Sequence, residues 1–459
     1  MSTIPTYQDF EKNTNGSDES VAEFVMACIM SYRNSDEYRI AVLADKYDRQ
    51  LNVTIMDYTK RLYSMTGVET NDFTASNNKL CSNFFNRLNT QRCLYSLGNG
   101  VSFIGAGESG EDKTKELLGP HFDHDIKEAG YYALIHGYSY LFWDMDRTHV
   151  FKMTEFVPLV DEDTGELRAG IRWWQLSEEK PMIAVLYEED GFTKYQTGEN
   201  DGLVVAQPKR AYKTTYQTVP YDGTTEVIGE ENYVTLPIVR MYGSRLKQST
   251  LVGMRGAIDA YDLIRSGFAN DLTDCAEIYW IVNNAGGMDD SDLMRFRDRI
   301  KLQHIANVDG SDGAGVTPYT QDIPYQARQA FLTEIRADIY EDFGALDVHT
   351  VAAGATNDHI DAAYQPLDEN ASDFETWVSE AIIKLLRIIG IDDEPVFTRN
   401  RISNQLEQVQ MVIAEAQWLD TETVLKKLPN LSQEEVDAIL TRNDIEDMRR
   451  FAAVEETEE

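Results

Sequence analysis

The sequence is poor in cysteine and in basic residues, and it contains no long uncharged apolar run. Its cysteines are too few and too irregularly spaced for a disulfide framework or a zinc site, so we expect buried thiols in a reducing compartment. They are Cys28, Cys81, Cys93 and Cys275. No run of about 18 apolar residues indicates a membrane span, and the N-terminus lacks the basic and apolar segments of an export signal. We therefore expect a soluble protein that is neither exported nor membrane-spanning.

The motifs of the common enzyme classes are also missing. The sequence contains no G-x-S-x-G, G-x-x-x-x-G-K-[ST], H-E-x-x-H or CxxC segment. Hydrolases, nucleoside triphosphatases and redox enzymes depend on such motifs to hold a nucleophile, a phosphate, a metal or a reactive thiol. We therefore expect no catalytic residue, no cofactor and no metal.

Positive charge is scarce. Lysine and arginine number 42 against 78 acidic residues, which gives a formal net charge of −36. Proteins that coat nucleic acid neutralise phosphates with clustered lysines and arginines. A general coating role is therefore excluded, although an acidic conduit could still let DNA pass without gripping it.

What the chain does contain is ample material for a core. Its 459 residues are 42% hydrophobic and 10% aromatic, which is enough for two or more subdomains. Helical spacing predicts helices over residues 20–32, 35–50 and 77–97, and one long or broken helix over 111–135. The first is predicted from a Ser-x-x-Glu capping box at Ser20, and the third has Leu80, Phe84, Leu88 and Leu94 on its inner face.

From Tyr138 the hydrophobic period changes to two, which predicts a meandering antiparallel subdomain. Its expected strands are 139–143, 150–157, 170–174, 182–187, 192–196 and 213–219. Helices followed by strands, rather than alternating with them, favour an α+β fold.

Residues 237–287 predict a strand, a helix of about six turns and about 36 Å, and a second strand at 276–282. The helix has an apolar stripe, with Asp259, Asp262 and Asp271 among the charged residues around the rest. That stripe is formed by Leu251, Met254, Ile258, Tyr261, Ile264, Phe268 and Leu272. A short charged helix at 291–301, a loop at 309–315 and a long helix at 325–343 are expected next. Residues 346–357 connect to a helical tract that Pro366 is predicted to break and kink.

Three motifs have a chemical interpretation to weigh. Gly105–Gly110 fits G-x-G-x-x-G between a short strand and a helix, but acidic residues lie where a pyrophosphate would approach. His121 and His124 stand three residues apart among acidic neighbours, and a solvated helix turn is favoured over a metal site. The acidic runs 144–146 and 161–163 lack the later glutamate of a cation loop and are expected to be turns.

The order and spacing of these segments resemble the portal proteins of tailed double-stranded DNA bacteriophages, over about residues 20–445. The resemblance is carried by Pro237-Ile238-Val239, the Asp259–Asp262 run, Asn270-Asp271, the Leu-Gly turn in LGNGVSF at 97–103, the order of the strands after Tyr138, and LDTETVL at 419–425 followed by Leu428-Pro429.

The resemblance implies a portal fold with a helical and β-rich wing, a long-helix stem, a small α/β clip and a helical C-terminal crown. The implied segments are 1–240 wing, 241–275 first stem helix, 276–322 clip, 323–345 second stem helix, 346–358 tunnel loop, 359–400 kinked helix returning to the wing, and 401–459 crown with an acidic tail.

The resemblance also implies a function: a dodecameric ring at one capsid vertex, serving as the conduit for double-stranded DNA packaging and ejection. The missing Walker motif argues against this chain being the packaging motor itself. Implied partners are the terminase large subunit, the major capsid and scaffold proteins and a head-completion or adaptor protein. The implied location is the virion, after assembly from the host cytoplasm. The alternative is a dinucleotide-binding enzyme that uses the Gly105–Gly110 loop.

Two sets of site residues follow from the resemblance. The tunnel loop facing DNA would comprise Val348, His349, Thr350, Val351, Ala352, Ala353, Gly354, Ala355, Thr356 and Asn357. The clip loop that docks the motor would comprise Asp309, Gly310, Ser311, Asp312 and Gly313.

Overall fold

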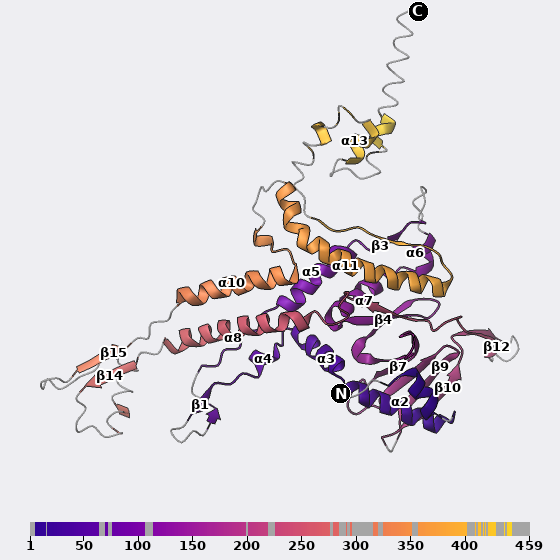
Figure 1. Ribbon diagram of the computed structural model, residues 1–459, viewed down its shortest axis with the longest axis horizontal. Helices are drawn as coiled ribbons and strands as arrows, with labels where there is room; N and C mark the ends of the chain where they lie inside the picture. Colours follow the sequence, from indigo (N-terminus) through magenta and orange to yellow (C-terminus); the bar gives the residue numbers. More distant parts are fainter. Residues whose placement is uncertain are drawn as a thin grey trace, which may run out of the picture. The chain divides into compact units, whose positions relative to one another are not determined.

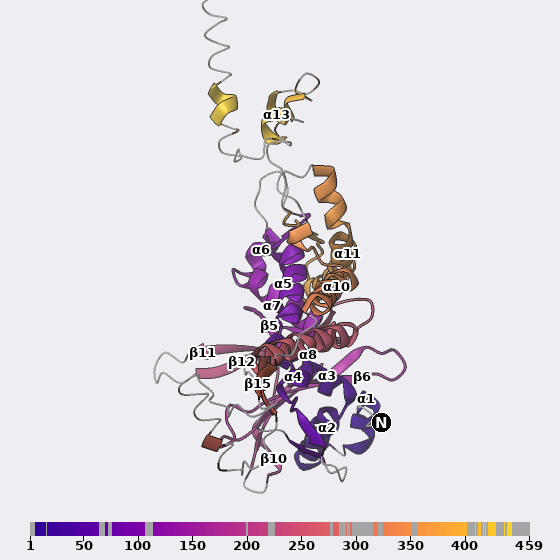
Figure 2. The ribbon, with the colours of Figure 1, turned by 90° about the vertical axis from the view of Figure 1, so that its left-hand side faces the viewer.

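The computed structural model describes residues 5–14, 16–63, 69–71, 76–105, 113–198, 201–218, 225–275, 279–283, 315–319, 325–350 and 357–401, with shorter stretches within 291–295 and 409–442. The chain forms two compact units (Figures 1 and 2). The first unit comprises Met1–Ala41, Leu88–Thr250 and Tyr340–Glu459, and the second comprises Val42–Arg87 and Leu251–Ile339.

Three helices open the chain: α1 Tyr7–Asn13, which was not predicted, α2 Asp18–Arg33 and α3 Asp36–Asp48. The last two correspond to the helices predicted over 20–32 and 35–50. The predicted start at Ser20 is wrong, because Ser17 is the N-cap of α2 and its side chain accepts the N–H of Ser20. Two carboxylates in the first turn then favour the earlier start through the helix dipole.

The β-rich part of the first unit is built from two antiparallel sheets, of order β10-β9-β8-β7-β6 and β13-β4-β5. The strands are β4 Tyr138–Trp143, β5 Thr148–Lys152, β6 Phe156–Val160, β7 Leu167–Trp174, β8 Ile183–Glu188, β9 Gly191–Thr197, β10 Leu203–Arg210 and β13 Ile238–Tyr242. A separate pair, β11 Lys213–Thr218 and β12 Thr225–Glu231, extends from the sheets in both views (Figures 1 and 2).

Three details of these strands differ from the sequence prediction. The strand predicted over 150–157 is two strands, because a 3-10 turn at Met153–Glu155 separates β5 from β6. Strands β10 and β12 were not predicted, since the apolar residues of each come in one short run rather than in alternation with polar ones.

The three-stranded sheet lies between two hydrophobic cores, which explains its alternating side chains. Tyr138 and Tyr140 face the core shared with α2 and the five-stranded sheet. Leu141 and Trp143 face the core shared with α7 and α11. Alternate side chains of β4 therefore point into different cores, and both faces of the strand are apolar, as expected of a buried sheet.

The remaining helices of the first unit cover that second core. They are α5 Phe84–Leu97, α6 Lys113–Leu118, α7 Phe122–His136 and α11 Asn357–Ile389. Of the two alternatives for 111–135, one long helix or a broken one, the structure shows the broken one, with α6 and α7 separated by residues 119–121. The predicted inward position of Leu94 is wrong, because 45% of its surface is exposed.

The tract after residue 357 is one helix rather than a broken one. Pro366 lies inside α11, which continues over 33 residues. The ribbon changes direction along its course, as expected where a proline removes a backbone donor (Figure 1). After it, β16 Pro395–Phe397 pairs antiparallel with β3 Val101–Phe103, a pairing that the sequence analysis missed.

The second unit contains α4 Val53–Met56, α8 Leu251–Cys275 and α10 as far as Ile339, the helix itself being Tyr325–Phe343. Its strands are the antiparallel pairs β1 Arg61–Tyr63 with β2 Glu69–Asn71 and β14 Tyr279–Asn283 with β15 Gly315–Tyr319. The bounds of α10 are those predicted. Among the described residues of the expected 291–301 helix, Ser291, Met294 and Arg295 are helical.

Beyond residue 401 the structure describes α13 Thr421–Lys427 and a few further residues, mostly helical. Helices and mostly antiparallel meanders occupy separate stretches of the chain, so the predicted α+β class is confirmed. No helix among the described residues has the length and apolarity that crossing a bilayer requires.

Candidate functional site

Helix α8 changes the chemistry of its buried face halfway along its length. The buried residues of its first half are the predicted apolar ones, Leu251, Met254 and Ile258. In its second half they are polar: Asp262, Ser266 and Asn270 are 0%, 1% and 8% exposed. The prediction that Asp262 lies on the charged outer side is therefore wrong, and Leu272, predicted in the stripe, is 54% exposed.

The three polar side chains hold a chain segment against the helix. Asp262 Oδ1 accepts the backbone N–H of Ser82 at 2.8 Å, and Ser266 Oγ accepts that of Leu80 at 3.0 Å. Asn270 Oδ1 accepts that of Asn78 at 2.6 Å. The spacing matches because four helical residues rise about 6 Å and two extended residues span about 6.6 Å.

This docking explains why α5 begins at Phe84 and not at 77 as predicted. Residues 76–83 present alternate N–H groups to α8, and a helix would use those donors internally. Leu80, predicted on a helical inner face, lies in this non-helical segment. A local periodicity cannot reveal acceptors that lie almost two hundred residues away.

Asp259 adds a second attachment one turn earlier. Its carboxylate accepts hydrogen bonds from Tyr47 Oη and from Thr54 Oγ1, the latter at 2.7 Å. Arg255 Nε lies 3.4 Å from the same carboxylate. The described residues within 42–87 are thus fastened to α8 along much of its length. Two of the acceptors, Asp259 and Asp262, are acids that the sequence analysis assigned to the charged outer side of the helix.

Helices α8 and α10 run side by side (Figure 1). Residues of both helices line a shallow open groove. Arg328 of α10 forms an ion pair with Asp271 of α8 and lies 6.0 Å from the Phe268 ring. Phe331 of α10 lines the groove and is 44% exposed. This long-helix pair therefore leaves apolar surface uncovered in the isolated chain.

The predicted clip lies beyond these helices. Strands β14 and β15 pair antiparallel from Tyr279 opposite Tyr319 to Asn283 opposite Gly315. Gly315 is a strand residue and not part of the predicted loop. The five residues of the proposed motor-docking set, Asp309 to Gly313, lie outside the described residues.

The predicted tunnel loop is described only at its two ends. Val348–Thr350 forms a 3-10 turn in which Asp347 Oδ1 accepts the N–H of His349 at 3.1 Å, and Val348 is 50% exposed. Asn357 is the first residue of α11. Val351, Ala352, Ala353, Gly354, Ala355 and Thr356 lie outside the described residues.

The glycine-rich alternative meets a carboxylate where a phosphate would have to bind. The N–H of Gly105 donates to Asp393 Oδ1 at 3.0 Å, and Thr114 Oγ1 donates to Asp393 Oδ2 at 2.6 Å. Although burial raises the pKa of Asp393, these hydrogen bonds outweigh it and hold the pKa below its usual range, so the group is an anion. The strand before the glycines is antiparallel to β16, not part of a βαβ unit. Ala106 to Gly110 lie outside the described residues.

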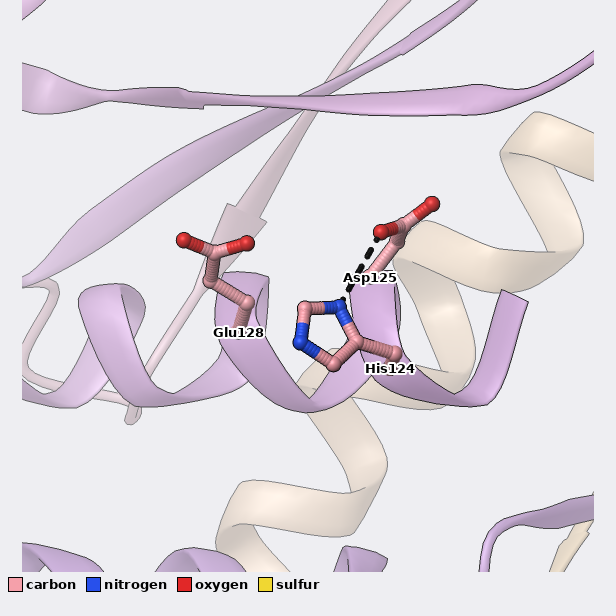
Figure 3. A group of neighbouring side chains, drawn as sticks. All are labelled: His124, Asp125 and Glu128. Carbon is pink, nitrogen blue, oxygen red and sulfur yellow. Dashed lines mark hydrogen bonds and ion pairs between the residues drawn. The ribbon is translucent and has the colours of Figure 1, made fainter. Parts of the chain in front are cut away.

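The histidine-rich turn at the start of α7 brings together His124, Asp125 and Glu128 (Figure 3). Asp125 is 1% exposed, and its carboxylate accepts two hydrogen bonds from Arg147, at 3.1 and 2.9 Å. An arginine that occupies both oxygens competes with a cation. His121 is the N-cap residue of α7 and makes no side-chain capping bond. The arrangement favours the predicted helix turn over a metal site.

The acidic runs form the predicted turns. Asp144 Oδ1 accepts the N–H groups of Asp146 and Arg147, and Asp161 Oδ1 accepts those of Asp163 and Thr164. Each aspartate satisfies the backbone of its own turn, which leaves less capacity for a cation.

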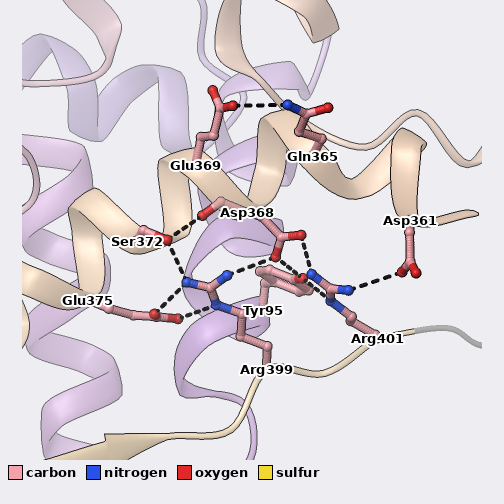
Figure 4. A network of polar contacts seen from close by, with 9 residues as sticks. All are labelled: Tyr95, Asp361, Gln365, Asp368, Glu369, Ser372, Glu375, Arg399 and Arg401. Carbon is pink, nitrogen blue, oxygen red and sulfur yellow. Dashed lines mark hydrogen bonds and ion pairs between the residues drawn. The ribbon is translucent and has the colours of Figure 1, made fainter.

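A polar network that the sequence analysis missed holds residues 399–401 on α11 (Figure 4). Arg399 binds Glu375 and Asp368, with Nη1 2.9 Å from Asp368 Oδ1. Arg401 binds Asp368 and donates to Tyr95 Oη at 2.9 Å. Acids at 361, 368 and 375 recur every seven residues, a signal that they share one face of the helix.

The comparisons with known proteins agree with this arrangement. Residues 36–449 match the family of phage portal proteins described as SPP1 Gp6-like. A portal protein of Clostridium phage phiCD119 is 24% identical over 426 residues, which cover 86% of this chain and 92% of that protein. The portal protein of Bacillus phage SPP1 is 23% identical over 376 residues, covering 76% and 72%. Since the family match spans most of the sequence, this chain belongs to the SPP1 Gp6-like family of phage portal proteins.

Proposed function

We propose that this chain is the subunit of a ring at one capsid vertex, through which double-stranded DNA enters and leaves the head. The observation that carries the proposal is the second compact unit, in which two long helices and the β14–β15 pair form a body of their own within a portal-family chain. Helix α8 alone spans about 37 Å, so the pair has the length of a channel wall.

The uncovered groove between α8 and α10 supports assembly of copies around an axis. Ile264, Ala327 and Phe331 line it, and a neighbouring copy would cover them in a heterologous contact that closes into a ring. We infer a dodecamer from the resemblance to portal proteins.

The net charge of −36 supports a conduit rather than a DNA-binding protein. Twelve copies would surround the duplex with acidic walls, which weaken phosphate binding and let DNA slide. A structural role, without catalysis or a cofactor, is consistent with the carboxylate of Asp393 at the glycine-rich loop.

We assign the segments as follows. Helices α8 and α10 form the stem, residues 276–322 the clip, and Val348 to Asn357 the tunnel loop. The segment 309–313 docks the terminase large subunit. Residues 42–87 brace the stem, since they are fastened to α8. Capsid, scaffold and head-completion proteins contact the wing and crown in the virion, after assembly in the host cytoplasm.

A packaging assay with rings built into empty capsids tests the conduit. Replacing Ala352, Ala353 and Gly354 by bulky or acidic residues narrows the proposed tunnel loop or adds charge next to DNA. We expect rings of normal size that package less DNA, while the same changes at the exposed turn 177–179, which lies outside the segments assigned to the channel, leave packaging unaltered. Normal packaging by the tunnel-loop variants would contradict the assignment, and loss of the ring would make the segment structural.

A further inference from the structure

A cleft in the first unit is lined by basic, aromatic and aliphatic side chains. It lies between α11, β13 and the turn that precedes β7. Trp377, Lys384 and Arg387 of α11 enter its lining at helical spacing, so one face of that helix forms a wall. Arg240 of β13 and Lys247 contribute from the other side.

The charge balance of the cleft is opposite to that of the chain. Four cationic residues line it against two carboxylates, Glu166 and Glu380, whereas the whole chain has 42 basic and 78 acidic residues. Glu380 is already paired with Lys384 at 2.6 Å. Among the described residues, no carboxylate forms an ion pair with Lys247 or Arg387. The cleft is therefore an isolated positive site on an acidic protein.

Arg240 adds a partly buried cation. Its guanidinium lies 5.2 to 5.9 Å from the ring centroids of Tyr138, Tyr140 and Tyr242, and Nη1 donates to Tyr242 Oη at 3.2 Å. Its Nε and Nη2 atoms are buried and have no hydrogen-bond partner in the described part of the chain. A cation that lacks a carboxylate keeps a positive potential near the cleft, where water screens it weakly.

Lys247 is positioned by its backbone. Its φ of 54° lies in the left-handed region, which is uncommon for a side-chain-bearing residue, and its N–H closes a turn onto Ser244. The ammonium lies 4.5 Å from the Tyr242 centroid and 5.2 Å from that of Trp377. Aromatic rings thus hold the lysine at the cleft without neutralising it.

The cleft also offers apolar surface. Val234 is fully exposed, and Trp377 and Ile388 line the opposite wall. A nucleic-acid backbone has no large apolar side chains to cover such residues, whereas a peptide can have both carboxylates and apolar side chains. We propose that this cleft binds an acidic peptide segment of a partner protein, whose carboxylates pair with Lys247 and Arg387 and whose apolar side chains cover Val234 and Trp377.

Fluorescence anisotropy on the full-length protein tests the proposal. The probe is a fluorescein-labelled peptide in which pairs of glutamates alternate with single leucines, at physiological salt. Lys247→Ala combined with Arg387→Ala should weaken binding about tenfold, the effect of removing two partly exposed ion pairs. The matched control combines Lys12→Ala with Arg39→Ala, which removes the same charge from exposed helix positions outside the cleft. Thermal unfolding verifies that both double variants remain folded.

Four results would overturn the proposal. The first is no binding of the glutamate peptide by the unmodified protein. The second is an equal loss of affinity in the cleft and control variants, which would make the attraction nonspecific. The third is equal binding of a peptide with glutamine at every glutamate position. The fourth is displacement of the probe by short duplex DNA at the same charge concentration. Selective loss in the cleft variant, for the glutamate peptide alone, supports the proposal.

Discussion

At the scale of single residues, Gly137 shows how one missing side chain positions the element that follows. It ends α7 with a φ of 103°, and its N–H donates to the carbonyl of Ala133 at 2.9 Å. A Cβ there would lie 2.8 Å from the carbonyl carbon of Gln248. The left-handed conformation and the close backbone together require glycine, so β4 can start directly after the helix.

Gly137→Ala should therefore destabilise the first unit by roughly 3 kcal/mol, because backbone strain and a steric clash add. Gly165 is the matched control: its φ is 70°, but a Cβ there would meet nothing within 4 Å. Gly165→Ala should lower the free energy of unfolding by about 1 kcal/mol, because only backbone strain opposes it. Urea unfolding of both variants measures the difference in their free energies of unfolding. Equal losses would show that the nearby backbone of Gln248 does not exclude a Cβ at position 137.

The carboxylate of Asp368 should make the stability of the fold depend on pH in the acidic range. Burial raises its pKa, but hydrogen bonds from Arg401 and Tyr95 outweigh burial and hold the pKa below its usual range. Because the pKa is lower in the folded state, the ionised group stabilises the fold above its unfolded pKa of about 4. That contribution is lost as the pH falls through the lower folded value.

Unfolding free energies measured from neutral pH down to about pH 3 test this expectation. Asp368→Asn should be less stable than the unmodified chain at neutral pH, and the two should converge below about pH 4. Asp36→Asn, in an exposed pair whose atoms lie 3.9 Å apart, is the control and should change little. A constant difference between Asp368→Asn and the unmodified chain across this range would contradict the expectation.

At the scale of elements, the polar face of α8 should decide whether residues 76–83 stay attached. Asp262→Ala removes the acceptor for Ser82 N–H and for the Asn52 amide, which leaves buried donors without a partner. We expect the free energy of unfolding to fall by about 2 to 3 kcal/mol. We also expect faster hydrogen exchange of the Leu80 and Ser82 amides, while α8 remains helical.

Asp271→Ala is the control for that substitution on the same helix. It removes the partly exposed ion pair with Arg328 and should lower the free energy of unfolding by about 0.5 kcal/mol. If amide exchange at Leu80 and Ser82 is unchanged in Asp262→Ala, then the ladder of side-chain acceptors does not hold the segment.

The elements also show where sequence reasoning works and where it stops. Strong local periodicity predicted α10 at its observed bounds and most strands of the antiparallel meander. The same reasoning misread 77–83 as helix, because Asp262, Ser266 and Asn270 on a distant helix take over its backbone donors. Polar residues on a helix were read as solvent-facing, although partners elsewhere in the chain bury them.

Candidate site residues divide in a similar way. The order of segments was sufficient to indicate the portal family, which the comparisons show. The tunnel-loop and clip assignments remain predictions, since most of those residues lie outside the described ones. The basic cleft was not foreseen, because Arg240, Lys247 and Arg387 come together only through the packing of α11 on β13.

At the scale of the whole molecule, charge and apolar surface act in opposite directions on assembly. A net charge of −36 makes copies repel, whereas the groove at Ile264 and Phe331 favours contact between them. Salt screens the repulsion over about 8 Å at physiological ionic strength but leaves the apolar contact intact. Assembly should therefore increase as salt is raised from low to moderate concentration.

The most direct test of the account is end-on electron microscopy of the purified full-length protein, with mass photometry on the same sample at micromolar concentration and moderate salt. The account predicts closed rings with a central channel and a mass near twelve times 52.2 kDa. A sample that contains only the 52.2 kDa species, with no rings in any image, would contradict it.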